Sequence, residues 1–585
     1  MYLCGLGDAL NLRFKRSSDQ DDMNASVTTY KEAAKLKTAY PRHALLAARK
    51  WAELSYQCND VSSALDGYRI ALEILPKVAW LGLNTHDILY FERSESLGYN
   101  SAACAIRLGR LAVAIELLDM SRSFFWQQAS SLRSDFEKLK DCKPQLAEEL
   151  EDVGRQLDKE CFIASINDGT AKDSRADPHM TKDIARERHV LGGVWDRLLG
   201  EVRGLPEFEN FLRPVPFDQL RQAANGGRIV IIINASEYGV DALIFDDVKP
   251  IHHIPLPDAD YGILVKFANK IVLERPINGT ADQQHRYLKA HLKPALRRVW
   301  DDIVDPIFNE IKIPLEVDAA GPQQCIWWYL TGPLTFIPIH AAGPGRVVDV
   351  SRLVISSYLT TLDTLFRTQN KKMQGVMAPP KLLAVSQPQT PGQPPLPLST
   401  EEAKKVTQMF RSAGMPDEDI VHLDGSEATI GCVSATLETS SWVHFACHGL
   451  QHQYHAFAMK SGFALNDGNL ELSQIASKRL HTARFAFLSV CDAAAGIQGL
   501  PGEAMHLAGG LQFAGFQSVI ATMWSICDED APKVADLTYQ YLFRNGLEGL
   551  DHSEASTALN RAVASLRENA GMTLDRWAPF IHFGL

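Results

Sequence analysis

A histidine and a cysteine each follow a short apolar run in the C-terminal third of this 585-residue chain. The first run, Trp442–Ala446, leads to His448 and Gly449, and the second, Phe485–Val490, leads to Cys491. Apolar runs of this length between polar or glycine-rich segments are typical of buried parallel strands. Functional sites of open α/β sheets form beyond the carboxyl ends of such strands. We therefore expect His448 and Cys491 to emerge together at one edge of a sheet.

An imidazole beside a thiol is the minimum arrangement for a cysteine nucleophile. A free thiol with a pKa of about 8.5 is mostly protonated at neutral pH, so a neighbouring histidine is needed to accept or balance its proton. The backbone N–H groups of Gly449 and Cys491 are the expected oxyanion donors, because a glycine lets a substrate approach the backbone. The small residues at 493–502 are expected to form a loop around a bound peptide.

The neighbouring residues Cys447 and His444 also have structural interpretations. A lone cysteine at a strand end is more often a core residue, and Cys447, on the opposite strand face from His448, is expected to pack in the core. His444 lies four residues before His448, roughly 13 Å along a strand, so the two cannot bind one metal. We expect His444 to be a core histidine or to support the site indirectly.

A structural zinc site remains an alternative, since Cys447, His448, His452 and His455 fall within nine residues. Against it, the chain has no C-x-x-C element, which most zinc sites combine with a second pair of ligands. A phosphate-binding G-x-x-x-x-G-K-[ST] loop is also missing from the sequence. The sequence therefore predicts no cofactor.

Six motifs occur in order in the C-terminal region. They are Leu334–Ala342 (L-x-x-I-P-x-H-A), His444–Gly449 (H-F-A-x-H-G), Leu488–Cys491 (L-S-A-C, with valine for alanine), the glycine-rich Gly502–Gly515, Ser518–Trp524 (S-V-I-A-x-x-W) and Trp577–Phe580 (W-A-x-F). Together they resemble the CHAT domain family of caspase-like peptidases, related to caspases and separases, over about residues 217–585. The resemblance implies peptide-bond cleavage by a dyad, with His448 as general base and Cys491 as nucleophile.

Departures from the family pattern leave the substrate preference open. Many members follow the cysteine with an acid and then Thr-Gly, whereas this chain has Asp492-Ala493-Ala494. Ser489 stands where the related metacaspases carry an acid for basic substrates, so a basic P1 preference is not implied. Asp492, Asp528 and Asp530 are the alternative sources of acidity in a substrate pocket, although each could instead be solvated or cap a helix.

Residues 1–163 have helical periodicity and a weak repeat, in which Ser26, Tyr30 and Ala33 recur 38 positions later as Ala64, Tyr68 and Ala71. A degenerate third copy spans Ala102–Arg122, and residues 130–163 read as a long amphipathic helix or capping hairpin. The small-aromatic-small spacing resembles tetratricopeptide repeats, with an ordinary helical bundle as the alternative. Such repeats imply that a protein partner binds there and activates the enzyme.

The predicted organisation is a multidomain α+β protein. It has the repeat region at 1–163, a linker at 164–190, a non-catalytic, pseudo-caspase half at 191–375 and a catalytic half at 376–585. Strands at 228–234 and 239–245 and a long helix over 281–311 are expected in the non-catalytic half, and a solvated linker at 391–397 in the catalytic one. Repeats joined to such a domain resemble fungal and bacterial effector proteins, the fungal branch above all, which implies a role in programmed cell death or defence.

Net charge, cysteine spacing and hydropathy exclude further classes of function. A net charge of −11 argues against nucleic-acid binding, and ten singly spaced cysteines favour a reducing compartment. The sequence shows no signal peptide and no apolar run of 18 residues, so we expect a cytoplasmic protein without a membrane span. The hypothesis is a regulated cysteine endopeptidase acting on a protein or peptide. The alternative is a non-catalytic interaction scaffold of the same architecture, and the oligomeric state stays open.

Overall fold

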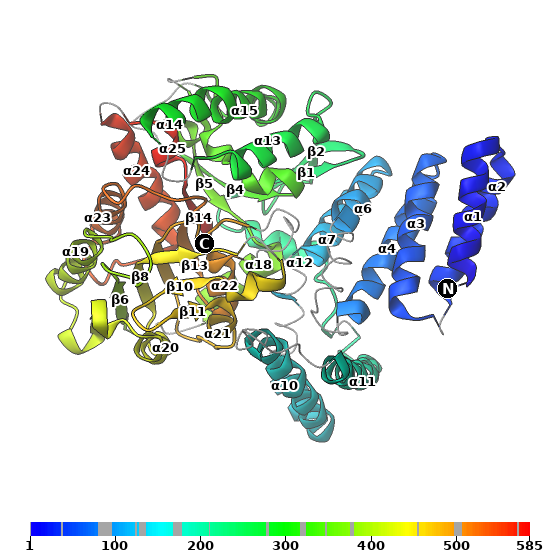
Figure 1. The fold of residues 1–585 in the computed structure, drawn as a ribbon, viewed down its shortest axis with the longest axis horizontal. Helices are drawn as coiled ribbons and strands as arrows, with labels where there is room; N and C mark the ends of the chain where they lie inside the picture. Colours follow the sequence, from blue (N-terminus) through cyan, green and yellow to red (C-terminus); the bar gives the residue numbers. More distant parts are fainter. Residues whose placement is uncertain are drawn as a thin grey trace. The chain divides into compact units, whose positions relative to one another are not determined.

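A computed structural model describes most of the chain in two compact units, Met1–Phe217 and Asp218–Leu585. The described residues are 2–36, 39–79, 96–122, 126–127, 136–167, 178–209, 211–276, 280–315, 323–345, 348–374, 379–452, 455–496, 506–569 and 572–585. Figure 1 labels the elements, and each unit is considered by itself.

The first unit is an all-helical region, as predicted. Its helices are α1 (Tyr2–Ser17), α2 (Gln20–Lys35), α3 (Pro41–Gln57), α4 (Val61–Ala79), α6 (Ser96–Arg107), α7 (Leu111–Ser121), α9 (Glu137–Cys142), α10 (Pro144–Asn167) and α11 (Pro178–Arg203). From α1 to α7, each helix packs against the next one along the chain, so that hairpins stack side by side (Figure 1).

The repeated positions of the sequence lie at equivalent, buried places in two successive hairpins. Tyr30 on α2 and Tyr68 on α4 are almost fully buried. Each hairpin also has a glycine where its two helices meet. A Cβ on Gly7 would lie 2.8 Å from the Tyr30 ring, and one on Gly67 would lie 3.0 Å from Ala52. Small residues thus let the paired helices approach closely, which agrees with a repeat array, while the tetratricopeptide assignment stays a prediction.

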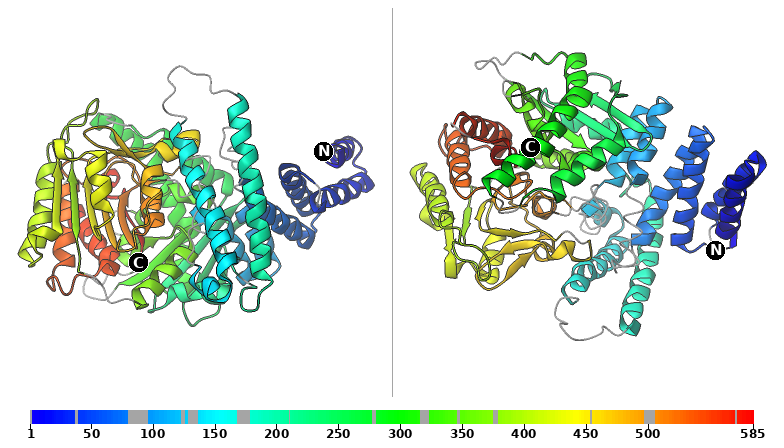
Figure 2. Two further views of the ribbon diagram at one scale, coloured as in Figure 1. Left: turned by 90° about the horizontal axis from the view of Figure 1, so that it is seen from below. Right: turned by 45° about the horizontal axis from the view of Figure 1, so that its top comes forward.

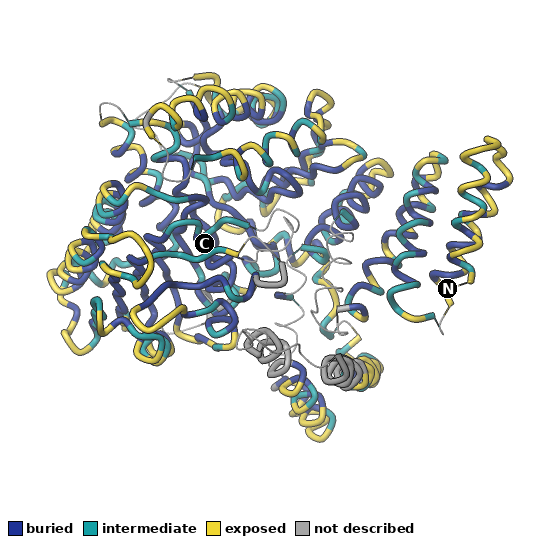
Figure 3. Tube along the Cα trace, in the orientation of Figure 1, coloured by how far each residue is buried: buried dark blue, intermediate teal, exposed yellow. Residues whose placement is uncertain are grey.

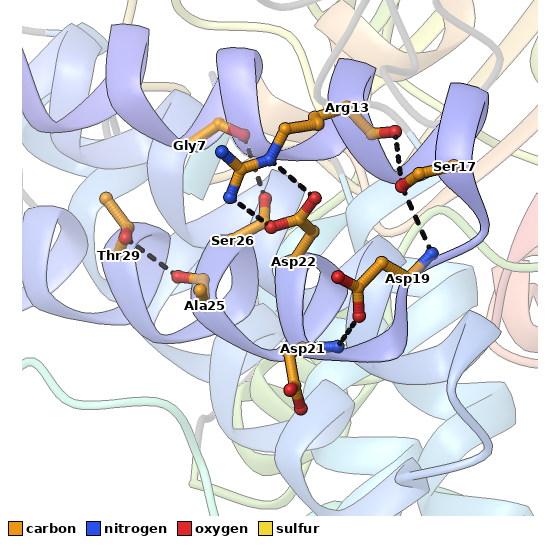
Figure 4. Close-up of polar contacts among 9 residues, drawn as sticks. All are labelled: Gly7, Arg13, Ser17, Asp19, Asp21, Asp22, Ala25, Ser26 and Thr29. Atoms are coloured by element: carbon orange, nitrogen blue, oxygen red, sulfur yellow. Dashed lines mark hydrogen bonds and ion pairs between the residues drawn. The ribbon is translucent and has the colours of Figure 1, made fainter.

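Polar contacts fix the turn of the first hairpin (Figure 4). The Arg13 guanidinium binds the Asp22 carboxylate across the two helices, with Nε 2.6 Å from Oδ2. Asp19 caps α2 by accepting the Asp21 N–H at 3.0 Å, and the Ser26 hydroxyl donates to the Gly7 carbonyl at 2.9 Å. Because Ser26 is fully buried, its bond joins the repeat signature directly to the α1–α2 packing.

The segment predicted as a linker, 164–190, is helical at both ends, and its residues 168–177 lie outside the described residues. Helix α11 begins at Pro178, inside the 164–190 segment expected to be a linker, and the first compact unit extends to Phe217 rather than ending near residue 190. The reason is that Trp195 and Leu198 of α11 share a buried core with Leu150 of α10. The polar composition that indicated a linker describes the start of α11, whereas its later residues are apolar.

The second unit is built on an eleven-stranded, mostly parallel sheet. Its strands, in spatial order, are β3 (His252–Pro255), β2 (Gly239–Phe245), β1 (Ile229–Ser236), β4 (Gln324–Leu330), β5 (Val354–Tyr358), β14 (Phe580–Gly584), β13 (Ser518–Thr522), β12 (Phe485–Ser489), β8 (Trp442–Ala446), β6 (Leu382–Ser386) and β7 (Ile420–Asp424). The predicted α+β class is confirmed, and the strands predicted at 228–234 and 239–245 are present as β1 and β2, which form an antiparallel hairpin. The strands form the buried centre of this unit in Figure 3.

The sheet contains two parallel sets that run in opposite directions. Strands β1, β4 and β5 are parallel to one another, as are β13, β12, β8, β6 and β7. Between the two sets, β14 is parallel to β5 but antiparallel to β13. The carboxyl ends of the two sets therefore lie at opposite edges of the sheet.

Helices cover the sheet, and a small second sheet adjoins it (Figure 2). The principal helices are α13 (Tyr261–Leu273), α19 (Ser399–Ser412), α20 (Ile430–Leu437), α22 (Leu507–Ala514), α23 (Ala531–Leu542) and α24 (Ala555–Glu568). The long helix predicted at 281–311 is present as α14, α15 and α16, with two π-helical turns between them. The small sheet has the order β11 (Asn469–Glu471), β10 (Gly462–Ala464), β9 (His448–Leu450). Among the described residues, none of the helices combines the length and apolar character that crossing a membrane requires.

Candidate active site

The ends of β8 and β12 bring His448 and Cys491 to one edge of the sheet. The two strands are adjacent and parallel, and their last paired residues are Ala446 and Ser489. His448 and Cys491 each follow two residues after that pair, so both leave the sheet at the same level. The two apolar runs are therefore the neighbouring parallel strands that the sequence predicts.

Gly449 allows the two strand ends to touch. A Cβ at this position would lie 2.5 Å from a methyl carbon of Val490 and closer still to the Cys491 carbonyl oxygen. Any side chain here would displace the backbone that carries the thiol. The sequence predicts that this glycine lets a substrate approach the backbone. In the structure, Val490 and the Cys491 carbonyl, which directly follow β12, fill the space that a side chain would take. Its role as an oxyanion donor stays a prediction.

The turn after Cys491 is held by the end of β13. The Thr522 hydroxyl donates to the Val490 carbonyl at 2.6 Å, and the Ala494 N–H donates to the Thr522 carbonyl at 2.8 Å. Within the turn, Asp492 has a φ of 57°, in the left-handed region that only a few non-glycine residues adopt. The thiol thus sits at the start of a tight turn pinned on both sides.

Opposing influences act on the partly buried Cys491 thiol. Burial raises its pKa, and the negative charge of Asp492 raises it further. The Ile526 N–H, the Ser525 hydroxyl and the more distant charge of Arg275 act in the other direction, because each favours the thiolate. Burial dominates, so the resting thiol is protonated and needs a base to become a nucleophile.

His448 is oriented by a backbone carbonyl. Its Nε2 lies 2.7 Å from the carbonyl oxygen of Pro394. Since a carbonyl can only accept, Nε2 carries a hydrogen, and the neutral ring then presents Nδ1 as a proton acceptor. Within the described part of the chain, no hydrogen bond joins His448 to Cys491, and sites without substrate commonly show such looser geometry.

Two neighbours of the pair belong to the core. His444 is fully buried, stacks on Phe487 and places its Nε2 3.1 Å from a carboxylate oxygen of the buried Glu402. Cys447 is also buried, and burial raises the pKa of its thiol. Both packing roles match the predictions from strand alternation and spacing.

Two of the three proposed pocket acids lie near the pair. The Asp492 carboxylate accepts from the Arg275 guanidinium and from the Ser525 hydroxyl, each at 3.3 Å. Asp528 is partly buried and accepts the N–H of Leu398. Burial raises the pKa of Asp528, while that N–H and the charge of His448 lower it.

Asp530 is wrong as a pocket acid. Its side chain is completely buried, and its two carboxylate oxygens bind Arg576 at 2.6 and 2.7 Å. An ion pair of this kind joins the start of α23 to the C-terminal segment and leaves no carboxylate free for a substrate. The acidic run after the Ser518–Trp524 strand therefore divides into a buried structural residue, Asp530, and a more accessible one, Asp528.

Four contributors to the site were missed by the sequence analysis. Ser525 and Ile526 directly follow the Ser518–Trp524 motif and hydrogen-bond with the thiol. Their position after that motif was the signal that could have identified them. Pro394 is exposed, as expected for the proline-rich segment predicted as a solvated linker, but its contact with His448 had no sequence signal. Arg275 follows α13 in the upstream half and had no sequence signal.

A metal site finds no support in the described residues. Within them, no group of three or more His, Cys, Asp or Glu side chains is placed to hold a metal ion. His448 is bonded to Pro394, and Cys447 is buried. The side chain of His455, one of the four residues considered for zinc, lies outside the described residues.

The sheet and its helices define a caspase-like α/β domain preceded by a helical region. Residues 293–585, half of the chain, match the CHAT domain family, and the chain belongs to that family. The match begins later than the resemblance over 217–585, so the upstream strands β1 to β3 and helix α13 lie outside it.

Comparison with solved structures returns separase and gingipain. Separase in the Saccharomyces cerevisiae separase–securin complex aligns over 99% of this chain and 47% of its own, with 10% identity and a TM-score of 0.45. The arginine-specific cysteine proteinase gingipain R aligns over 56% of this chain and 74% of its own, with 10% identity and a TM-score of 0.32. This chain thus spans about half the length of the separase chain. A comparison with curated proteins gives no match.

Proposed function

We propose that this CHAT-domain protein is a regulated cysteine endopeptidase with Cys491 as nucleophile and His448 as general base. The observation that supports it most is the adjacency of the two residues beyond parallel neighbouring strands, with Gly449 against the Cys491 carbonyl. Membership of a caspase-like family adds to this support, although the activity must be argued from the site itself.

The proposed reaction uses the groups around the pair in sequence. Nδ1 of His448 accepts the thiol proton, and the Cys491 sulfur attacks the scissile carbonyl carbon. The backbone N–H groups of Gly449 and Cys491 are the proposed donors to the oxyanion. The imidazolium then protonates the leaving amine as the C–N bond breaks, and water, deprotonated by the same imidazole, hydrolyses the thioester. The Pro394 carbonyl keeps the ring in the required tautomer throughout.

Regulation through the helical region belongs to the same proposal. Residues 1–163 would act as tetratricopeptide-like repeats whose groove binds an activating protein partner, supported by the equivalent burial of Tyr30 and Tyr68 in successive hairpins. Residues 191–375 would form the non-catalytic half and 376–585 the catalytic half. The substrate would be a protein or peptide, and a role in cell death or defence rests on the family resemblance alone.

A reducing, cytoplasmic setting is also proposed. The nine cysteines with described side chains are all free, and a working thiolate must stay reduced.

One observation favours a second candidate, a non-catalytic interaction scaffold. Burial raises the pKa of the Cys491 thiol, and among the described residues this thiol has no hydrogen bond with His448. A scaffold has no need of that bond, so activity must be measured directly.

The test is mass-spectrometric cleavage profiling of a diverse peptide library. Wild type, Cys491→Ala and His448→Ala would be incubated with it, and Cys432→Ala serves as a matched control because Cys432 is exposed and lies on α20. We expect the same cuts from wild type and the control, and none from the other two variants. Cuts that persist in Cys491→Ala would exclude this nucleophile. A complete lack of cuts, even with a partner bound to the helical region, would favour the scaffold.

A further inference from the structure

A side chain from outside the family match reaches the turn that carries the thiol. Arg275 follows α13, upstream of residue 293, where the CHAT match begins. Its guanidinium donates to the Asp492 carboxylate at 3.3 Å and lies over the Trp524 ring, 5.8 Å from the ring centre. The Arg275 side chain is only 13% exposed, so it is an enclosed contact and not a loose surface pair.

The topology explains how an upstream arginine arrives there. Strand β3 is antiparallel to β2, which is antiparallel to β1, so β3 runs in the direction of β1. It therefore ends at the edge opposite to the thiol. Helix α13 follows β3 and spans about 20 Å along its 13 residues, which carries the chain back towards the edge at which Cys491 lies.

The negative charge of Asp492 gives an arginine at this place a function. Its carboxylate follows the nucleophile directly, and a lone negative charge there would oppose formation of the thiolate. Among the described titratable groups, Cys447 also interacts electrostatically with the Cys491 thiol, and His448 follows the adjacent strand. Ser525 donates to Asp492 as well but carries no charge to offset it.

We propose that Arg275 is a positioning residue for the Cys491 nucleophile, acting through Asp492. The positive charge of Arg275 neutralises the carboxylate beside the thiol, so that this carboxylate no longer opposes formation of the thiolate. The same contact fixes the turn in which Asp492 has a positive φ. This inference rests on the proposed function for its meaning, yet the state of the thiol can be measured without any peptidase activity. It also makes the non-catalytic half of the domain a contributor to the active site.

The experiment measures iodoacetamide alkylation of Cys491 against pH, read by mass spectrometry on the full-length protein. The variants are Arg275→Met, Arg275→Lys, Asp492→Asn and the double variant Arg275→Met/Asp492→Asn. Alkylation of the exposed Cys432 in the same samples is the internal control. Arg298→Met is the matched control, since it removes an exposed arginine that is paired with Asp302 in the same half.

We expect Arg275→Met to slow alkylation of Cys491 about fivefold near neutral pH and to shift its profile to higher pH, because fewer molecules carry the thiolate. Arg275→Lys should retain most of the rate, and Asp492→Asn alone should raise it. The double variant should return close to wild type, which a purely structural role for Arg275 does not predict.

Two results would overturn the proposal. One is an Arg275→Met profile identical to that of wild type and Arg298→Met. The other is a double variant as slow as Arg275→Met, since Asp492 would then not be the intermediary. If Arg275→Met does not fold, Arg275→Lys and Asp492→Asn still test the proposal. Unchanged alkylation in Asp492→Asn would contradict the claim that the Asp492 charge opposes formation of the thiolate. Altered alkylation profiles without any peptide cleavage, even with a partner bound to the helical region, would count against the endopeptidase proposal and leave this one standing.

Discussion

The two parallel halves of the sheet present very different groups at their strand ends. In the upstream half, β1 and β4 are adjacent, and the residue after β4 is the buried Thr331. Its hydroxyl donates to the Ile233 carbonyl at 3.2 Å and accepts the Ala235 N–H at 2.9 Å. In the downstream half the equivalent place holds His448 and Cys491. Two adjacent parallel strands thus end in hydrogen bonds to the backbone in one half and in a histidine and a cysteine in the other. The chemistry of a strand end therefore depends on its residues and not on the fold.

The histidines of the domain show the same contrast. His582 is completely buried between the Ser357 and Ser518 hydroxyls, at 2.8 and 2.7 Å, and burial lowers its pKa to about 3. Burial also lowers the pKa of His340, which belongs to the Leu334–Ala342 motif, to about 4. His448, by comparison, is partly exposed. His582 and His340 therefore stay neutral and structural, while His448 is the histidine that we propose as the general base.

The largest expected effect distinguishes two strand-end residues, His448 downstream and Thr331 upstream, by what their loss does to the cleavage rate. His448→Ala should lower the cleavage rate by at least about 10³-fold with little change in melting temperature, because a general base is lost at a partly exposed site. Thr331→Val should do the opposite. It should leave the cleavage rate within about twofold but destabilise the fold by about 1 kcal/mol, since the Ala235 N–H loses its acceptor while the Ile233 carbonyl keeps only the Thr331 N–H.

Peptide cleavage kinetics and thermal unfolding of the same preparations check both expectations. A rate that drops equally in Thr331→Val and His448→Ala would contradict the division of roles between the two halves.

The second prediction distinguishes two neighbouring acids. Asp530→Ala should destabilise the protein by about 3 kcal/mol, because it leaves Arg576 without its partner. Asp528→Asn should change stability by less than about 0.5 kcal/mol but alter the pH–rate profile, since the charge of Asp528 interacts with His448. Denaturant unfolding and pH–rate profiles measure the two effects. A stable Asp530→Ala variant with altered specificity would restore Asp530 as a pocket acid.

The third prediction concerns the contact between the two strand ends. Gly449→Ala should destabilise the protein by about 2 kcal/mol and lower thiol reactivity and cleavage by about 10²-fold, because the new methyl group must displace the Cys491 backbone. Gly431→Ala is the matched control, since a Cβ there meets nothing within 4 Å. Chemical unfolding and alkylation of Cys491 in both variants provide the comparison. Equal behaviour of the two variants would mean that the strand ends are not in contact.

How much the sequence predicted depends on whether an interaction is local in the chain. The strands leading to His448 and Cys491, and the burial of His444 and Cys447, followed from apolar runs and alternation. The Pro394 contact and the Arg275–Asp492 pair could not be predicted, because each joins segments far apart in the sequence with no motif at one end.

The helical region shows the same limit. The repeat signature at Tyr30 and Tyr68 correctly predicted stacked helices, since it reports packing between successive hairpins. Helix α11 was not predicted at Pro178, because its apolar face is completed by α10 and the charged and small residues at its start give no sign of that partner. Asp530 was misassigned for a similar reason, since its partner Arg576 lies 46 residues away.

The smallest expected effect tests the neutral histidines through acid stability. The folded pKa of His340, about 4, lies below the usual 6.5, so between these values the unfolded chain binds a proton that the folded one excludes. Its contribution to stability is therefore complete above pH 6.5 and is lost as the pH falls towards 4. His340→Gln should lose about 1 kcal/mol less stability than wild type between about pH 7.5 and pH 5.5, even though it is less stable at both because the hydrogen bond between Nδ1 and the Tyr358 hydroxyl is gone. Urea unfolding of both proteins at the two pH values measures this difference. Identical pH losses would show that His340 can be protonated in the fold, and the contrast with His448 would then rest on His582 alone.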